Sequence, residues 1–440
     1  MEDITMRKIF QYIMLAVVTI VMASCTSDIE ETTATAGKSN VQLVVGEFPA
    51  FGDSQTRAIG TPDEGKTSWA VGDELLLEMT SKTFGTKYAA FKYNGSNWEL
   101  ASGELSYKED EVPTFPHVYY APNYKWEAGE LVLKEGKVAG TDEYIEGKAN
   151  ITPNGEAITV KFAEATRNYS RLRIATMPNK QITVAFNNRY TPAGSSVSAI
   201  FPRYTLTSDE KGNAYLYGTF GQYCDFEVKY EGAPLASHTF YQAAENAKSY
   251  VLDATVVSLA VEGITYDQIV EDVKKELDAG KTYINLILAP DADEETLEAI
   301  NIGLKDARDG SINLTLIGCK KIPSRGFRHF DMLKSIALPD VTEIGENAFL
   351  DCTRLQKVVL GNLTKVYGKA GEKGIFEGCR TKDIDLVLSK DQKVMNGGET
   401  EGGYCWTADI ITDYDRSDEH VNKKFLGYEF KSITCIYKFE

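Results

Sequence analysis

Short runs in which apolar and polar residues alternate fill the chain from about Val41 to Ala254. They include ELLLEM, KYAAFKYNG, AITVKFA, RLRIATM, QITVAFN and CDFEVKYEG. Turn-forming pairs such as Asn94-Gly95 and Glu231-Gly232 separate them. Such runs, rich in β-branched and aromatic residues, are typical of antiparallel strands with one buried face. The pattern predicts antiparallel β-sandwiches, and its length predicts two in tandem that meet within residues 164–168.

Helical spacing replaces the two-residue period after Val257. The segment TYDQIVEDVKKELDAGK places Thr265 and Gln268 where they form a capping box. Its apolar residues share one helical face, and these are Ile269, Val273 and Leu277. The run YINLILA then predicts a buried strand, and DEETLEAINIGLKDA predicts a second helix.

A 22-residue repeat follows the helices. The residues that recur at this spacing are Leu316, Leu338 and Leu360; Ile322, Ile344 and Val366; and Phe327 and Phe349. Phe376 follows 27 residues later, and YGKAGEKG accounts for the insertion. Cys352 and Cys379 each come three residues after a Phe. A fixed period of this length predicts a solenoid, because no coil can bury its own apolar side without a stacked neighbour.

A secretory signal is predicted at the N-terminus. Arg7 and Lys8 precede an apolar run from Ile9 to Ala23, which is shorter than a bilayer-spanning helix needs. The end of the run, VMASC, resembles a bacterial lipobox, although Met22 stands where Leu is usual. The resemblance implies cleavage before Cys25 and acylation of its thiol. An ordinary signal peptide followed by a chance cysteine is the alternative.

Residues 25–40 are polar and small, and their composition predicts a flexible tether. Three acidic residues follow Cys25 closely, as in the export signal of surface lipoproteins from Bacteroidetes, which this stretch resembles. The position of the start stays open between Met1 and Met6, because acidic residues lie between the two.

Composition and charge narrow the class of partner. The 440-residue chain is 43% hydrophobic and 25% charged, which indicates a globular protein with a core. Its formal net charge is −17. A protein this acidic is poorly suited to neutralise phosphates, so nucleic acid is not expected as a partner.

No sequence motif indicates catalysis, a metal or a cofactor. The histidines are scattered, at His117, His238, His329 and His420. Six cysteines besides Cys25 have no metal-ligand spacing, and these are Cys224, Cys319, Cys352, Cys379, Cys405 and Cys435. Buried free thiols are the favoured interpretation, and a disulfide between Cys352 and Cys379 is the alternative. We therefore expect no cofactor and no enzymatic activity, although the many carboxylates leave a glycosidase open.

Three motifs resemble the fimbrillin-like family of Bacteroidetes: Thr56-Arg57-Ala58, WAVGDELLLE at 69–78 and NAKSYVLDA at 246–254. In polymerising members a trypsin-like protease cuts after an Arg at this place, and a strand from a partner replaces the first strand. The resemblance implies cleavage between Arg57 and Ala58, with loss of a strand that includes Val41–Val45. The alternative is a loop arginine in a sandwich that keeps its first strand.

The segment Leu333–Leu355 resembles the BspA-like leucine-rich repeats of bacterial surface proteins, in the pattern LxxIxLPxVTxIGxxAFxxCxxL. The resemblance implies that the concave row of strands is the contact surface. Its solvent-facing residues would be Lys334, Ser335, Ala337 and Lys357.

Together these features predict a mainly β fold, with tandem transthyretin-like sandwiches of fimbrillin type before an α/β leucine-rich repeat solenoid. The predicted boundaries are 1–24 for the signal peptide, 25–40 for the tether, 41–165 and 166–256 for the sandwiches, 257–310 for a helical cap, 311–390 for the repeats and 391–440 for a C-terminal cap.

The favoured function is a non-enzymatic adhesion lipoprotein, anchored in the outer membrane and exposed on the cell surface. Its expected partner is a protein or glycan on a host or bacterial surface. The alternative is a tip or accessory subunit of a pilus, matured by cleavage after Arg57 and assembled with other pilus subunits. A carbohydrate-active enzyme is the third hypothesis.

Overall fold

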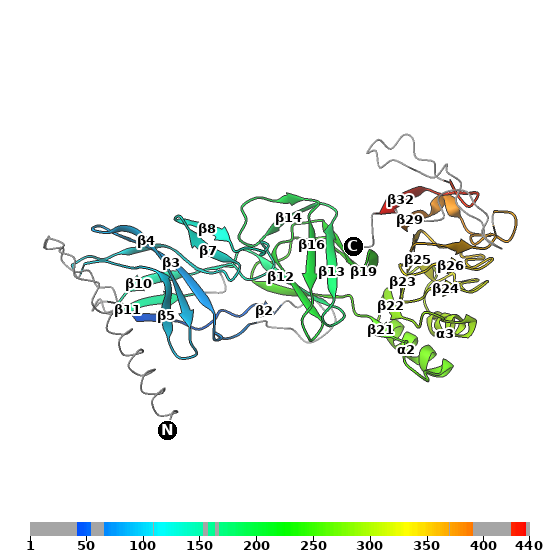
Figure 1. Cartoon of the computed structure of the whole chain (residues 1–440), viewed down its shortest axis with the longest axis horizontal. Helices are drawn as coiled ribbons and strands as arrows, with labels where there is room; N and C mark the ends of the chain where they lie inside the picture. The colour runs from blue at the N-terminus through cyan, green and yellow to red at the C-terminus, as the bar shows by residue number, and fades with distance from the viewer. Residues whose placement is uncertain are drawn as a thin grey trace, which may run out of the picture.

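The structure is a computed structural model that describes residues 42–53, 66–108, 110–152, 157–162, 167–368, 370–389 and 424–436. Strands make up 44% of the structure and helices make up 8% of it, which confirms the prediction of a mainly β protein. Three units follow one another along the long axis of the molecule (Figure 1). Cys25, Arg57 and Ala58 lie outside the described residues, as does most of the predicted C-terminal cap.

The first unit is built on an eight-stranded sheet. In spatial order its strands are β10 (Lys148–Ile151), β11 (Ala157–Lys161), β1 (Gln42–Val45), β5 (Trp98–Gly103), β4 (Gly85–Tyr93), β3 (Glu74–Ser81), β6 (Thr114–Tyr120) and β9 (Ile145–Glu146). A hairpin of β7 (Tyr124–Glu127) and β8 (Glu130–Leu133) adds to it. The first strand that the structure describes is internal to this sheet, since β1 pairs with β11 on one side and with β5 on the other.

The second unit has two sheets around one core. The larger contains β15 (Ala199–Ile200), β14 (Arg189–Pro192), β17 (Asn213–Thr219), β12 (Ser170–Ala175), β20 (Lys248–Asp253) and β2 (Gly52–Asp53). The smaller contains β16 (Arg203–Thr207), β13 (Gln181–Phe186), β18 (Cys224–Tyr230) and β19 (Ala233–Phe240). Leu172 and Leu216 from the first sheet pack with Val184 and Phe226 from the second.

The third unit begins with a strand and two helices. α2 (Tyr266–Asp278) starts with the predicted capping box of Thr265 and Gln268, and α3 (Glu294–Leu304) is capped by the Asp293 side chain. The segment predicted as a helical cap also contributes β21 (Val257–Ser258) and β22 (Tyr283–Ile287) to the main sheet. Its buried strand residues, such as Ile284 and Leu286, belong to the same core as the repeats.

Parallel sheets run through the rest of the third unit. The larger continues from β22 through β23 (Ile312–Ile317), β25 (Leu333–Leu338), β27 (Lys357–Leu360), β29 (Asp385–Ser389) and β32 (Ser432–Ile436). The smaller contains β24 (Lys321–Ile322), β26 (Glu343–Ile344) and β28 (Lys365–Val366). A 3-10 turn, η2 (Thr381–Asp383), and a pair of short strands, β30 (Lys424–Phe425) and β31 (Tyr428–Glu429), complete the unit.

The 22-residue spacing of the sequence reappears as the register between coils. Leu338 pairs with Leu360, and Ile322, Ile344 and Val366 align on successive strands. Phe327, Phe349 and Phe376 form a stacked row with centroid distances of 5.2 and 5.3 Å. Gly345 is required because a Cβ atom there would lie 2.4 Å from the backbone nitrogen of Ser324 in the preceding coil. The repeat is therefore a stack of coils around a continuous apolar core.

Side chains from outside the repeats close the two ends of this core. Val273 from α2, with Leu297 and Ile300 from α3, covers the first end. At the other end, Phe430 lies 5.4 Å from the Phe376 ring, and Ile433 is buried in the same core. Closure of both ends keeps the apolar faces of the terminal coils away from water.

Candidate functional site

The second unit covers the strand face that the sequence predicted as the contact surface. Ala337 is 1% exposed and clusters with Ala233 of β19. Ser335 is 7% exposed, and its hydroxyl donates to Asn313 Oδ1 at 2.7 Å. Lys357 pairs with Glu227 of β18 at 3.1 Å. Of the four residues, Lys357 is half-buried and Lys334 is exposed. The expectation of an open face formed by these four residues is wrong, because the chain's own β19 lies against it.

Buried hydrogen bonds fix the contact between these two units. Thr315 Oγ1 donates to the Pro234 carbonyl at 2.6 Å, and Asn285 Nδ2 donates to the Leu235 carbonyl at 2.9 Å. Ile317 of β23 belongs to the core of the second unit. Since apolar packing and hydrogen bonds act together here, the second and third units form one continuous interface.

Charge also contributes to this interface. The Glu227 carboxylate lies between Lys229 at 2.8 Å and Lys357 at 3.1 Å. Burial alone raises the pKa of Glu227, but the two ammonium groups outweigh burial and the pKa ends below its ordinary value. Glu227 is therefore ionised at neutral pH and holds the two units together through Lys357.

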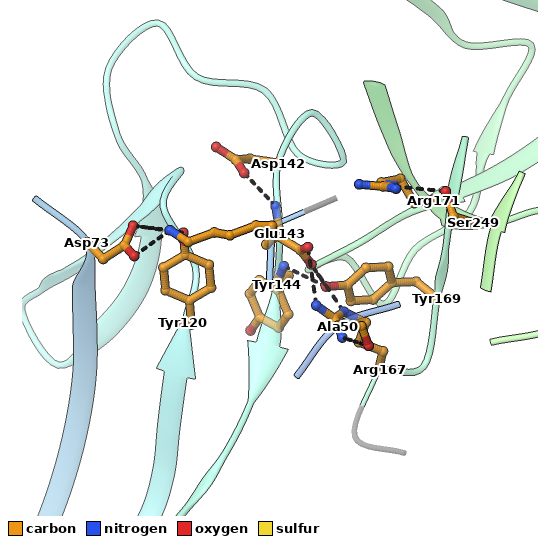
Figure 2. A network of polar contacts seen from close by, with 11 residues as sticks. Ala50, Asp73, Tyr120, Asp142, Glu143, Tyr144, Arg167, Tyr169, Arg171 and Ser249 are labelled. Atoms are coloured by element: carbon orange, nitrogen blue, oxygen red, sulfur yellow. Dashed lines mark hydrogen bonds and ion pairs between the residues drawn. The ribbon is translucent and has the colours of Figure 1, made fainter. Parts of the chain in front are cut away.

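A buried network joins the first unit to the second, and Figure 2 shows its side chains converging on Glu143. Arg167 donates to both Glu143 oxygens at 3.3 Å and to the Ala50 carbonyl at 3.3 Å. Tyr169 donates to Glu143 at 2.5 Å. Burial, followed by the charge of Glu143, raises the pKa of Tyr169 well above its ordinary value, so the phenol stays protonated and donates.

The segment that carries β1 and β2 is part of the same junction. The Phe51 ring lies under the guanidinium carbon of Arg167 at 4.0 Å and that of Arg171 at 4.8 Å. Phe51 also packs against Tyr169 and Tyr217. Residues 42–53 therefore contribute β1 to the first unit and both Phe51 and β2 to the second. The sequence patterns did not identify this junction, because Glu143 and Arg167 have no recognisable spacing.

A polar groove of about 740 Å³ lies at the N-terminal ends of the strands in the third unit. Arg308, Arg354 and Arg380 line it, and we call it the arginine groove. All three side chains are exposed. The guanidinium groups form no ion pair or hydrogen bond with another side chain in the described part of the chain. Arg354 and Arg380 follow Cys352 and Cys379 closely, which is the one sequence signal that could have pointed to this site.

The candidate chemistry of the other titratable groups is limited. The described residues contain no cluster of three or more His, Cys, Asp or Glu side chains suited to a metal ion. Cys352 is 1% exposed, and its thiol donates to the Phe327 carbonyl at 2.9 Å. Cys379 is partly buried and donates to the Phe349 carbonyl at 3.0 Å. Both thiols are free, and the contact of the Cys352 thiol with the Cys379 side chain, followed by burial, raises the pKa of Cys352 far above its ordinary value.

No protein-family model matches the chain, and no curated protein matches it. Within the described residues, neither helix is both long and apolar enough to cross a bilayer.

Proposed function

We propose that this chain is a non-enzymatic, surface-anchored lipoprotein that presents a binding surface to a protein or glycan on another cell. Acylated Cys25 would hold it in the outer membrane through the tether at residues 25–40. In the same proposal, the first two units are tandem β-sandwiches of fimbrillin type and the third is a leucine-rich repeat solenoid.

The arrangement of the units is the observation that carries this proposal. β1, the first described strand after Cys25, belongs to the unit at one end of the molecule, and the stacked coils lie at the other end (Figure 1). The buried junctions at Arg167 and at β19 favour a stiff connection between them. A stiff rod attached at one end would hold the coils away from the membrane.

Metabolic labelling with a palmitate analogue tests the anchor. We expect labelled wild-type protein, and no label in the Cys25→Ala variant. Cys224→Ala is a matched control, since Cys224 is 2% exposed and should leave the labelling unchanged. Equal labelling of Cys25→Ala and wild-type protein would refute a lipid anchor at Cys25.

A pilus subunit is the second candidate, and the internal position of β1 favours it. Leu43 of β1 is 5% exposed, so loss of this strand would open an apolar gap between β11 and β5. Such a gap accepts an extended strand from a partner. Sequencing the N-terminus of protein taken from intact cells separates the two functions. A start at Ala58 supports the pilus subunit, and a blocked start at Cys25 supports the anchored protein.

A further inference from the structure

We propose that the arginine groove binds an anionic saccharide, and that Arg354 and Arg380 donate hydrogen bonds to its carboxylate or sulfate groups. This inference rests on the proposed surface-binding function and adds the class of ligand to it. The strand face of the third unit is covered, whereas the arginine groove is open to solvent. Its three arginines are exposed, and their guanidinium groups form no ion pair in the described part of the chain.

The geometry of the stack brings the loops that carry these arginines to one edge of the sheet. Arg354 precedes β27 and Arg380 precedes β29, and these neighbouring parallel strands pair in register from Lys357 and Asp385 onward. Adjacent strands lie about 4.8 Å apart, so the two loops bring their arginines to neighbouring levels of one edge. Arg308 precedes β23, two strands from β27 along the sheet, and lines the same groove.

Backbone contacts hold the loops that carry these side chains. Asp385 donates its amide to the Gln356 carbonyl at 2.8 Å, and Gly310 donates its amide to the Asp331 carbonyl at 2.9 Å. Thr353 Oγ1 donates to Asp331 at 3.2 Å. The stem of Arg354 lies against Gly310, where a Cβ atom would come within 3.3 Å of it. The loops are therefore preorganised, which lowers the entropy lost on binding.

Apart from the pair of Lys431 with Asp385, the lining carries three arginines against the two carboxylates of Asp309 and Asp383, so its charge favours an anion. Guanidinium groups form paired hydrogen bonds with planar or tetrahedral oxyanions, and each of these bonds is charge-assisted. The remaining lysine of the groove, Lys431, already pairs with Asp385 at 2.8 Å. Since the whole chain carries a formal net charge of −17, most of its surface repels a polyanion, and binding there requires a local cationic site.

The rest of the lining favours a sugar over an acidic peptide. Tight peptide binding usually adds aromatic or aliphatic anchors in well-packed pockets to its charged contacts. Within the described residues, none of the large apolar side chains that are exposed lies in this groove. The lining instead offers the carboxylates of Asp309 and Asp383 and the amide of Gln356, which can bond to the many hydroxyl groups of a saccharide.

Binding of three polymers with one backbone tests the proposal on the purified whole chain. Dextran is neutral, carboxymethyl dextran carries carboxylates, and dextran sulfate carries sulfates. We expect binding to one or both anionic polymers, and at least about tenfold weaker binding to dextran. The stronger anionic polymer identifies whether carboxylate or sulfate is preferred. Absence of binding to both anionic polymers, or equal binding to dextran, would overturn the proposal.

Two double variants locate the binding. Arg354→Gln with Arg380→Gln keeps most of each aliphatic stem and should weaken anionic-polymer binding about tenfold or more. Arg325→Gln with Arg328→Gln removes the same charge from exposed positions on the repeats outside the groove lining, and should change binding by less than about twofold. Equal losses in both double variants would show charge attraction without a site.

The outcome is separable from that of the proposed function. Circular dichroism of both double variants checks that the stack is folded. If Cys25→Ala retains its label while the groove binds anionic polymers, the anchor fails and the saccharide site stands. If the label depends on Cys25 but neither anionic polymer binds, the anchor stands and the saccharide site fails.

Discussion

At the junction between the first two units, Arg167 contacts both the segment that carries Glu143 and the segment that carries Ala50 and Phe51. Its side chain is fully buried and contacts Glu143, Ala50 and Phe51. A buried carboxylate is stable only while it has partners, because removing its counter-charge leaves an unpaired ion in an apolar environment. The junction therefore depends on this pair far more than it would on a surface ion pair.

Replacing Arg167 should destabilise the junction strongly. Arg167→Ala is expected to lower the free energy of unfolding by about 3–5 kcal/mol, because Glu143 loses its buried partner. Urea denaturation followed by tryptophan fluorescence measures this, since Trp69, Trp98 and Trp126 lie in the first unit. Arg189→Ala, at an exposed position of β14, is the control and should stay within about 0.5 kcal/mol. A wild-type midpoint for Arg167→Ala would contradict this account.

Glu227 should make the interface between the second and third units sensitive to acid. Its pKa in the folded state is lowered below the ordinary 4.5, so the stability that it contributes is present above that pH and is lost as the pH falls through the lowered value. Urea midpoints at pH about 6 and about 3.5 measure the loss. Glu227→Gln should lose less stability than wild type on acidification, and an identical loss in both would argue against the role of Glu227.

At the scale of elements, the coils are stabilised mainly by contacts with their neighbours. Phe349 stacks between Phe327 and Phe376, with interplanar angles of 6° and 11°. The backbone amide of Phe349 donates to Ile375 in the next coil, and that of Phe327 donates to Ala348. Since each coil packs against and hydrogen-bonds to the next in the same way, loss of a central ring should weaken the packing of both neighbouring coils.

Truncation of the central ring should therefore be costly. Phe349→Ala is expected to lower the stability of the third unit by about 3–5 kcal/mol, because the ring is fully buried and leaves a cavity. Phe201→Ala is the matched control, since Phe201 is 64% exposed and should change stability by less than about 0.5 kcal/mol. Hydrogen exchange of the amides of β25 and β27 reports on the stack directly. Unchanged protection in Phe349→Ala would contradict a continuous core.

At the scale of the whole molecule, two interfaces determine how the three units are arranged. The second unit contacts the first through the Arg167 network and the third through β19. The second interface lies on the strand face that the repeat pattern predicted as open, so the available surfaces of the third unit lie elsewhere. A ligand that approached this face would first have to displace β19.

A bulky charge in the second interface should loosen the molecule. Ala337→Arg places a long cation where Ala233, Val359 and Val387 pack, and burial of an unpaired charge is unfavourable. Small-angle scattering should then show a broader range of molecular lengths, while circular dichroism keeps its β signal. Ala260→Arg, at an exposed position, should leave the scattering profile unchanged. An unchanged profile for Ala337→Arg would contradict a fixed interface.

Local spacing in the sequence determined much of the third unit. The capping box at Thr265 and the 22-residue register of Leu338 and Leu360 could be read from the chain, because each depends on residues that are close in sequence or that repeat regularly. The alternation of residues in β25 likewise separates the core-facing Ile336 from the outward-facing Ala337. Alternation gives the face of a side chain but contains no information on what covers that face.

Only the tertiary structure decided the contacts between distant segments. Ala337 meets Ala233, Lys357 meets Glu227, and Arg167 meets Glu143 and Phe51, although no spacing relates these residues. The same is true of the arginine groove, whose side chains come from separate loops at one edge of the sheet. Periodicity reports how a segment divides its residues between core and solvent, whereas burial between units depends on how whole sheets pack against each other.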